Sequence, residues 1–304
     1  MLRIFVPEIT RGPTQTTRAL HVTQSAMLPV RAGEMGNRLA ITALFIFAGT
    51  ASGNPSPSTD DVHTIIQRSV AANKADNQAA PFYDFSEREK DRRGGTKTFR
   101  EIMIDGSRYE ELIAVNNEPL SGAQKSDEND KLQQEREQRR VETPRERSAR
   151  VARYQKAQRR NRLMMDELVK AFDFTLTGED QINGHQVYVL TAKPRPGYNP
   201  PNMEAQVLTG MEGKLWIDKA SYHWVKVEAE VIRPVSIEGF LARVEPGTRF
   251  ELEKEPVSDS IWEPSHFAMR SRAKILMVFA HNGQADETYF DYAKNGASVS
   301  TTGH

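Results

Sequence analysis

The sequence has no cysteine among its 304 residues. Thiol nucleophiles, disulfide cross-links and cysteine-ligated zinc are therefore excluded. Attachment to a membrane through an acylated cysteine is also excluded for the segment 54–60, which follows the first apolar run. A chain of this length can bury a sufficient core without disulfides, so the absence does not argue against export.

The sequence also has no excess of charge of either sign, because 41 lysines and arginines balance 41 aspartates and glutamates. The summed electrostatic field gives no reason to expect a nucleic-acid partner, which would favour an excess of basic residues. Any charge-driven contact must depend on a local patch.

Catalytic signatures are absent as well: there is no G-x-S-x-G elbow, no Walker loop, no G-x-G-x-x-G and no H-E-x-x-H. The seven histidines are scattered singly. Glu228 and Glu230, about 7 Å apart on one strand face, fit a solvated surface better than acid–base chemistry. We therefore expect no catalytic residue, no metal site and no cofactor.

The longest apolar run, Leu39–Ala48, is half the length that a membrane span needs, which is about 20 residues. Arg38 precedes it and small residues follow at 49–53, in the order typical of a secretory signal peptide. We predict a signal peptide over 35–53 and a soluble periplasmic mature protein.

The remaining boundaries follow from composition. We expect that residues 1–34 either precede the true start of translation or form a long disordered leader, and both alternatives give the same mature chain. We also expect a linker over 54–60, one domain over 61–295 and a disordered tail over 296–304.

The predicted domain begins with helical periodicity. Thr59 or Asp60 suits a helix N-cap, and apolar residues recur at helical spacing from Val62 to Val70, which predicts a helix ending near Asn73. From Phe82 onward the pattern changes to strands separated by turn dipeptides at 105–106, 183–184, 246–247 and 282–283. These turns indicate antiparallel neighbours.

Two C-terminal stretches carry the clearest strand alternation. In 224–231 the odd-numbered residues, three valines and an alanine, point one way and mostly charged residues point the other. In 266–280 the odd positions form an apolar or small face about 13 residues long, which exceeds the usual strand length and indicates a strongly curved sheet.

Apolar strand faces greatly outnumber the helices available to cover them. A flat sheet would expose an apolar patch far above the few hundred Å² that soluble proteins tolerate. The sheet can curl around a cavity lined by Met and Phe, which suits a flexible acyl chain, or the same residues can fill a solid core. The pattern alone leaves both alternatives open.

A charge-dense segment, 124–162, lies between the two halves of the chain. It is typical of a solvated helix with i,i+4 ion pairs or of a partly disordered insertion. Its last part, 145–162, is basic, so transient contact with anionic lipid is a further hypothesis. Apolar residues from Leu163 to Phe172 would dock this helix on the sheet.

The stretch GKLWIDKASYHWVKVEAEV at 213–231, with the W-x-P at 262–264 and ETYFDYAK at 287–294, resembles the LolA/LolB/RseB-like family of periplasmic lipoprotein carriers. The resemblance covers roughly 61–295, with the charged segment as a departure, and it rests on strand and turn patterns. It implies an α+β fold: a strongly curved antiparallel β half-barrel with helices over its concave face and a hydrophobic cavity. Arg100 and Arg108 are candidates for the family's lid-locking arginine, but neither lies in a recognisable motif.

The resemblance also implies a function. We predict a non-enzymatic carrier that binds acyl chains of lipoproteins or lipids for outer-membrane sorting, with inner- and outer-membrane transport proteins as partners. The alternative is an envelope interaction or stress-sensor protein that uses the same fold to bind a protein. The residues expected to line the cavity are Leu215, Ile217, Val225, Val227, Val231, Phe267, Met269, Ile275, Met277 and Phe279.

Overall fold

The computed structural model describes residues 61–237, 242–275 and 279–295. The expected leader, signal peptide, linker and tail lie outside these residues. None of the helices in the described part of the chain combines the length and the apolar character that crossing a bilayer requires.

The first helix, α1 (Val62–Ala79), begins at Asp61, whose carboxylate accepts a hydrogen bond from Thr64 N at 2.9 Å. It runs six residues past the predicted end at Asn73. The apolar spacing stops there because the next inward-facing residues are polar, yet Asn73 and Asp76 are buried and the helix continues. A 3₁₀ turn, η1 (Ala80–Phe82), follows with a proline in it.

The strands form one antiparallel sheet in the order β4-β3-β2-β1-β13-β12-β11-β8-β7-β6-β5, with β10 paired to β12 and β9 paired to β10. Their bounds are β1 (Tyr83–Lys90), β2 (Thr96–Ile104), β3 (Ser107–Val115), β4 (Glu118–Pro119), β5 (Phe172–Ile182), β6 (His185–Pro194), β7 (Met211–Asp218), β8 (Trp224–Val231), β9 (Val235–Ile237), β10 (Ala242–Val244), β11 (Arg249–Ser258), β12 (Ile261–Ile275) and β13 (Phe279–Lys294).

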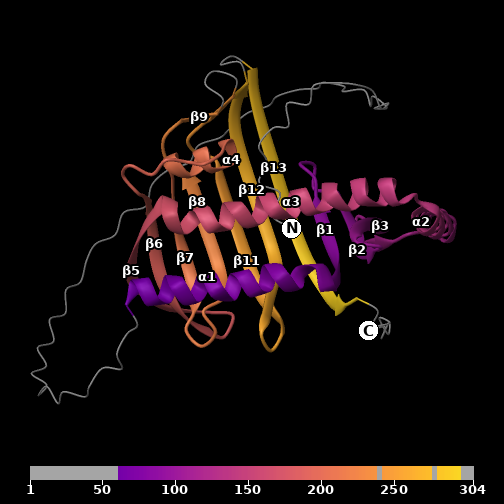
Figure 1. Cartoon of the computed structure of the whole chain (residues 1–304), viewed down its shortest axis with the longest axis horizontal. Helices are drawn as coiled ribbons and strands as arrows, with labels where there is room; N and C mark the ends of the chain where they lie inside the picture. The colour runs from indigo at the N-terminus through magenta and orange to yellow at the C-terminus, as the bar shows by residue number, and fades with distance from the viewer. Residues whose placement is uncertain (1–60, 238–241, 276–278, 296–304) are drawn as a thin grey trace, which may run out of the picture. The chain divides into compact units, whose positions relative to one another are not determined.

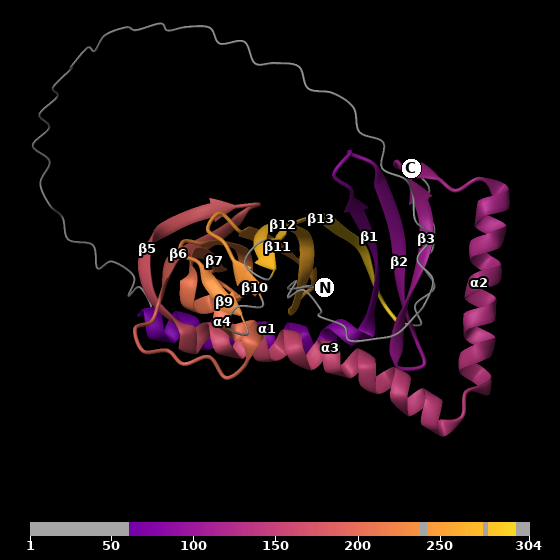
Figure 2. The same cartoon turned by 90° about the horizontal axis from the view of Figure 1, so that it is seen from above.

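The other helical segments are α2 (Gly122–Val141), α3 (Pro144–Ala171), the single turn α4 (Met203–Gln206) and the 3₁₀ turn η2 (Val207–Gly210). Helices α1 and α3 run side by side across one face of the sheet (Figure 1), and the sheet curves over them (Figure 2). The predicted α+β half-barrel with helices over its concave face is confirmed.

Two of the four predicted turns are β-hairpins. Asp105-Gly106 joins β2 to β3, and Asn183-Gly184 joins β5 to β6, with positive φ at all four residues as this turn chemistry requires. Pro246-Gly247 joins β10 to β11, which do not pair with each other.

The fourth predicted turn, Asn282-Gly283, is wrong, because both residues lie within β13. Gly283 faces Ser271 of β12, and a Cβ on the glycine would lie 2.5 Å from Ser271 Oγ. This glycine allows the close approach of two strands and does not reverse the chain.

The charged segment 124–162 forms α2 and the first part of α3. Each helix opens with a capping box, Ser121 with Gln124 and Thr143 with Glu146. Surface ion pairs one turn apart, such as Lys131–Glu128 and Arg140–Glu137, continue along α2.

The hairpin turn between β2 and β3 is held by the two long helices. Arg139 of α2 is buried and donates hydrogen bonds to the carbonyls of Ile104 (2.6 Å) and Ser107 (2.8 Å). From α3, Arg150 donates to Ser107 Oγ at 2.7 Å. A guanidinium can serve several carbonyls at once, so these arginines fix the charged helices on the sheet.

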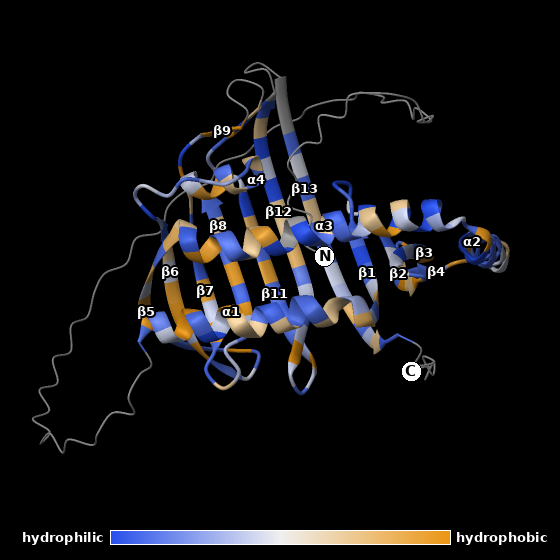
Figure 3. Cartoon of the chain, in the orientation of Figure 1, coloured by the Kyte–Doolittle hydropathy of each residue, from blue (hydrophilic) through white to orange (hydrophobic). Residues whose placement is uncertain are grey.

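The main core lies between the concave face of the sheet and the helices, where Figure 3 shows hydrophobic residues on the central strands behind α3. It extends without a break from Phe172 on β5 to Phe85 on β1. A smaller cluster of Val187, Val225 and Trp262 has Ile182 and Trp216 packed against it.

Candidate functional site

The concave face, here called the inner face, holds five of the residues that were predicted to line a cavity. They belong to the main core, together with Ile65 of α1 and Met164 of α3, and their exposed fractions are 0 to 7%. Because so little of them can be touched by water, the helices fill the space beside them in this closed arrangement. The five residues are Leu215, Ile217, Val227, Val231 and Phe267.

Val225 does not share this face, and its prediction is corrected. It packs with Val187 and Trp262 in the smaller cluster, whereas Trp224 joins the main core. The register between β7 and β8 shifts here, since Trp216 pairs with Lys226 but Ile217 pairs with Trp224. Val225 is the extra residue of this β-bulge, which reverses the alternation that the sequence indicated.

Three of the other four predicted residues have side chains outside the described part of the structure. Met277 lies outside the described residues, and the side chains of Ile275 and Phe279 lie outside the described part of the structure.

Met269 belongs to a row of mostly small residues that crosses six strands in register. The row is half-buried at five of its six positions and packs against the edge of the main core. At about 4.8 Å between strands it spans roughly 24 Å of the inner face. The small-residue row consists of Ala192, Gly213, Ala229, Phe250, Met269 and Ala285.

Helix α1 is joined to the sheet by a buried polar group centred on Asp76, here called the Asp76 latch. Asp76 forms an ion pair with Lys254 of β11 and accepts a hydrogen bond from the backbone N–H of Trp262 at 3.0 Å. Lys254 Nζ also donates to Asn73 Oδ1 at 3.2 Å. Burial alone would raise the pKa of Asp76, but His223, Lys254 and the Trp262 N–H outweigh it and hold the pKa below its usual value.

His223 completes the latch. Its ring stacks on Trp262, with centroids 5.4 Å apart and planes at 7°, and its Nε2 lies 3.2 Å from Asp76 Oδ1. Two turns before Asp76 on α1, Ser69 Oγ accepts a hydrogen bond from Trp224 Nε1 at 2.8 Å. Three of the five buried residues of α1 are therefore polar.

Helix α3 covers the inner face with Met164, Met165 and Leu168. It is tied to the loop after β6 by Glu167, which accepts a hydrogen bond from Tyr198 Oη at 2.7 Å. Burial would raise the pKa of Glu167, but Lys170 and Tyr198 lower it.

The two arginines considered for a lid-locking role have different surroundings. Arg108 Nη2 donates to the carbonyls of Ala80 (2.9 Å) and Tyr83 (3.0 Å), so it holds the end of α1 against the sheet. Arg100 pairs with Glu111 of the neighbouring strand. Only Arg108 contacts the helical cover.

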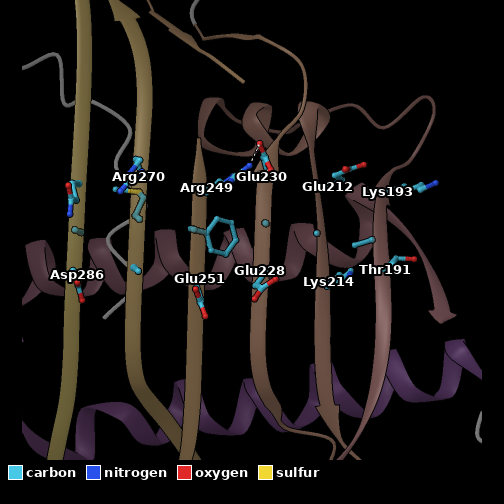
Figure 4. Close-up of a pocket in the computed structure, with 18 residues that line it drawn as sticks. Thr191, Lys193, Glu212, Lys214, Glu228, Glu230, Arg249, Glu251, Arg270 and Asp286 are labelled. Carbon is cyan, nitrogen blue, oxygen red and sulfur yellow. Dashed lines mark hydrogen bonds and ion pairs between the residues drawn. The ribbon is translucent and has the colours of Figure 1, made fainter. Parts of the chain in front are cut away.

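A shallow trough of about 660 Å³ lies on the opposite face of the sheet, here called the outer face. Figure 4 shows its charged side chains on β6 to β8 and β11 to β13, with the helices behind the strands. Both predicted surface carboxylates are here: Glu228 pairs with Lys226 at 3.0 Å and Glu230 with Arg249 at 3.0 Å. Acids and bases alternate, so the trough has no strong charge of one sign.

Sequence reasoning missed the Asp76 latch, although a signal was present. Ile65, Ser69, Asn73 and Asp76 share one helical face, so the inward stripe continues after its apolar part ends. Polar residues on an inward stripe indicate buried hydrogen bonds, but the sequence does not say to which strand.

No protein-family model matches the chain, and no curated protein matches it. Similar solved structures include an outer membrane lipoprotein-sorting protein domain from Vibrio parahaemolyticus, 11% identical, covering 76% of this chain and 94% of that one, with a TM-score of 0.30. A DUF1329 family protein from Desulfovibrio piger is 12% identical, covering 79% and 95%, with a TM-score of 0.28. MucB in complex with MucA(peri) is 12% identical, covering 78% and 100%, with a TM-score of 0.22.

Likeness at this level says nothing about the ligand or partner of this chain.

Proposed function

We propose that this protein is a non-enzymatic carrier that takes an acyl chain onto the inner face of its half-barrel when α1 and α3 move away. The observation that supports this is the polar attachment of α1. Only Ile65 and Ile66 are buried apolar residues of this helix, and its other buried residues are Ser69, Asn73 and Asp76. A helix with a polar buried side loses little when water replaces the sheet, whereas the sheet's apolar face needs a new cover.

An acyl chain can supply that cover. Each CH₂ group removed from water contributes about 0.8 kcal/mol, so a long chain supplies of order 10 kcal/mol before costs. A hydrogen bond of the kind that holds α1 contributes a net 0.5–1.5 kcal/mol, by order of magnitude. The cost of releasing the helices and of ordering the ligand offsets part of the gain from the acyl chain. A partner protein can then shift the balance between the closed empty state and the bound state.

The small-residue row offers a first contact for the ligand. It is mostly apolar and lies next to the main core, so an acyl chain can pack against it as the helices move away. The size of the row, roughly 24 Å, suits an extended hydrocarbon chain.

The setting that we propose is the periplasm, with inner- and outer-membrane transport proteins as partners. Arg153, Lys156 and Arg159 are exposed on the basic part of α3 and are available to anionic lipid head groups during transfer. Charge reversal at these three positions should weaken sedimentation with anionic vesicles and leave binding to neutral vesicles unchanged.

The test of the carrier is the affinity for a fluorescent fatty acid in variants with a weakened latch. Because the closed state competes with the ligand, Asp76→Asn and Ser69→Ala should bind about 3- to 10-fold more tightly than the wild type. Asp130→Asn, at an exposed site on α2, serves as the matched control and should not change the affinity. Native mass spectrometry of protein from an envelope extract should show acyl species bound to the wild type.

Equal affinity in the latch variants would mean that α1 does not compete with the ligand. An absence of any acyl binding would favour the second candidate function, an envelope protein that binds a protein partner. The observation favouring that candidate is the outer trough, where Lys214 and Arg270 make no ion pair with a described residue. In that case Lys214→Glu and Arg270→Glu should abolish partner cross-linking.

A further inference from the structure

The inner face changes character at its far end, on β12, β13, β1, β2 and β3. Here the rings of Phe85, Tyr289 and Tyr292 adjoin one another, with centroids 5.9 Å and 5.2 Å from that of Phe85. Between and around these rings stand carboxylates, in contrast to the aliphatic side chains on β6 to β8. We call this region the acidic end; its carboxylates are Glu87, Glu89, Glu101, Glu263 and Glu287.

Three of these carboxylates can reach a single ion. The oxygens of Glu87, Glu89 and Glu287 lie within 4.8 Å of one another. Clusters of this kind also occur on ordinary surfaces, so the cluster alone assigns no ligand.

Two other carboxylates of the acidic end supply an independent observation. Glu263 is 8% exposed, and its Oε1 has no hydrogen-bond partner among the described residues. Glu101 is 5% exposed and pairs in register with Phe85 of β1, so it adds a second buried carboxyl group beside the rings. Burial is the main cause that raises the pKa of Glu101 to about 8 and that of Glu263 to about 7. A buried carboxylate oxygen without a partner, such as Glu263 Oε1, is costly, and a bound cation removes that cost.

An arginine that also interacts with Tyr154 of α3 lies in the same place. Arg108 lies over the ring of Phe85, 4.5 Å from its centroid, and its charge acts on both Glu101 and Glu263. Its Nη2 is occupied by Ala80 and Tyr83, whereas its Nη1 is buried and has no partner among the described residues. The acidic end thus presents one unpartnered carboxylate oxygen and one guanidinium nitrogen beside aromatic rings.

We propose that the acidic end binds the head of the acyl ligand, and that this head carries a protonated amine beside a neutral hydrogen-bond acceptor. The ammonium bonds Glu263, the acceptor takes Arg108 Nη1, and the aromatic rings adjoin the cation, while the neighbouring carboxylates such as Glu101 add to the negative charge that attracts it. The main core reaches Phe85 and Tyr289 without a break, so one ligand can place its chain on the apolar part and its head on the acidic end. This inference rests on the proposed carrier function.

The test compares ligands of equal chain length on the full chain at about pH 8.5, where both carboxylates are ionised. Decylammonium, 1-decanol and decanoate are titrated against the bound fluorescent fatty acid. Decylammonium should bind about tenfold more tightly than 1-decanol, and decanoate should bind most weakly. Nα-decanoyl-lysine amide carries a decanoyl chain, an ammonium group and neutral amide oxygens that can accept a hydrogen bond. It should bind more tightly than decylammonium, which has no such acceptor.

Substitutions at the acidic end test which side chains cause the preference for decylammonium. Glu263→Gln should remove the preference for decylammonium over 1-decanol, Glu101→Gln should reduce it, and both should leave the affinity for 1-decanol unchanged. Glu228→Gln, on the outer face, is the matched control and should keep the preference. If 1-decanol and decylammonium bind equally to the wild type, the assignment of the head is overturned and the carrier function stands. If no decyl compound binds, the carrier function itself fails.

Whether the amine belongs to a free lipid or to an acylated peptide is decided by the lysine amide. Tighter binding of the lysine amide than of decylammonium supports a head with a peptide-like acceptor. Weaker binding would contradict the role given to Arg108 Nη1.

Discussion

Trp224 Nε1 donates a hydrogen bond to Ser69 Oγ across 2.8 Å, and this bond joins β8 to α1 in the interior of the protein. Trp224 is 7% exposed and Ser69 is 1% exposed. An indole N–H buried this deeply needs an acceptor, and α1 supplies it from a residue that an apolar helix would replace by alanine. The helix is thereby positioned by a directional bond as well as by packing.

Ser69→Ala should lower the free energy of unfolding by about 1–3 kcal/mol, because the indole N–H is left buried without an acceptor. Urea unfolding monitored by tryptophan fluorescence measures the loss. Ser126→Ala, at an exposed site on α2, is the control and should leave the midpoint unchanged. An unchanged midpoint for Ser69→Ala would mean that another acceptor replaces the hydroxyl.

The Asp76 latch should make stability depend on acid. The pKa of Asp76 is held below its usual value of 3.8, so its contribution is complete above that value and is lost as the pH falls through the lower folded-state pKa. At neutral pH, Asp76→Asn should cost about 3 kcal/mol, because Lys254 stays buried without its carboxylate. Unfolding followed from about pH 5 down to pH 2 should bring the two proteins closer together. A difference that stays constant with pH would contradict the ion pair.

The acidic end should show the opposite dependence on pH. The folded-state pKa of Glu263 is raised from 4.5 to about 7, so the folded protein binds this proton more tightly than the unfolded chain. Stability is therefore lost as the pH rises from about 4.5 to 7, and Glu263→Gln removes that loss. At pH 8 the variant should be more stable than the wild type by about 3 kcal/mol, with no gain at pH 4. Glu228→Gln on the outer face should show no such gain at either pH.

The features that could be predicted from the sequence are those fixed by neighbouring residues. Asp105-Gly106 and Asn183-Gly184 form hairpins because positive φ is a local property of these dipeptides. The alternation along β12 predicts a long strand because burial alternates along any strand with one covered face. The curved sheet follows from the amount of apolar strand surface, a property of composition.

The features that could not be predicted depend on contacts distant in the sequence. Val225 points away from the inner face because of a bulge, and a bulge is set by the pairing of β7 with β8. Glu101 and Glu263 are 162 positions apart by their residue numbers, and nothing in either local pattern tells that the fold buries both. Whether apolar strand faces line a cavity or a filled core likewise depends on how closely the helices approach.

Gly283 provides a test of the corrected strand. Gly283→Ala should destabilise the protein by about 1–3 kcal/mol, because the new Cβ would lie 2.5 Å from Ser271 Oγ on the paired strand. Ser271→Ala removes that oxygen and with it the hydrogen bond that Gly283 N donates to it at 2.9 Å, so in thermal unfolding the double variant should be about as stable as Ser271→Ala alone. If the two losses add without recovery, the cost arises from the backbone of Gly283 and not from the contact with Ser271.

Arg139 and Arg140 are adjacent arginines on α2 with opposite surroundings, and they form a matched pair for testing how the charged helices are held. Arg139 is 6% exposed and donates to the carbonyls of Ile104 and Ser107, whereas Arg140 pairs with Glu137 at the surface. Arg139→Ala leaves those carbonyls without a donor and should cost about 2–3 kcal/mol. Arg140→Ala should cause no measurable loss, because exposed ion pairs contribute little.

Hydrogen exchange in the Arg139 and Arg140 variants shows whether the loss of Arg139 loosens α2 alone or the whole sheet. If Arg139 fastens α2 to the β2–β3 hairpin, Arg139→Ala should speed hydrogen exchange first at the amides of α2 and of the hairpin, while the amides of β7 and β8 stay protected. Equal exchange in both variants would show that capping boxes and surface ion pairs hold the helix without this arginine. A uniform rise in exchange over all strands would instead show that α2 is part of the cooperative core, because its release then unfolds the whole sheet.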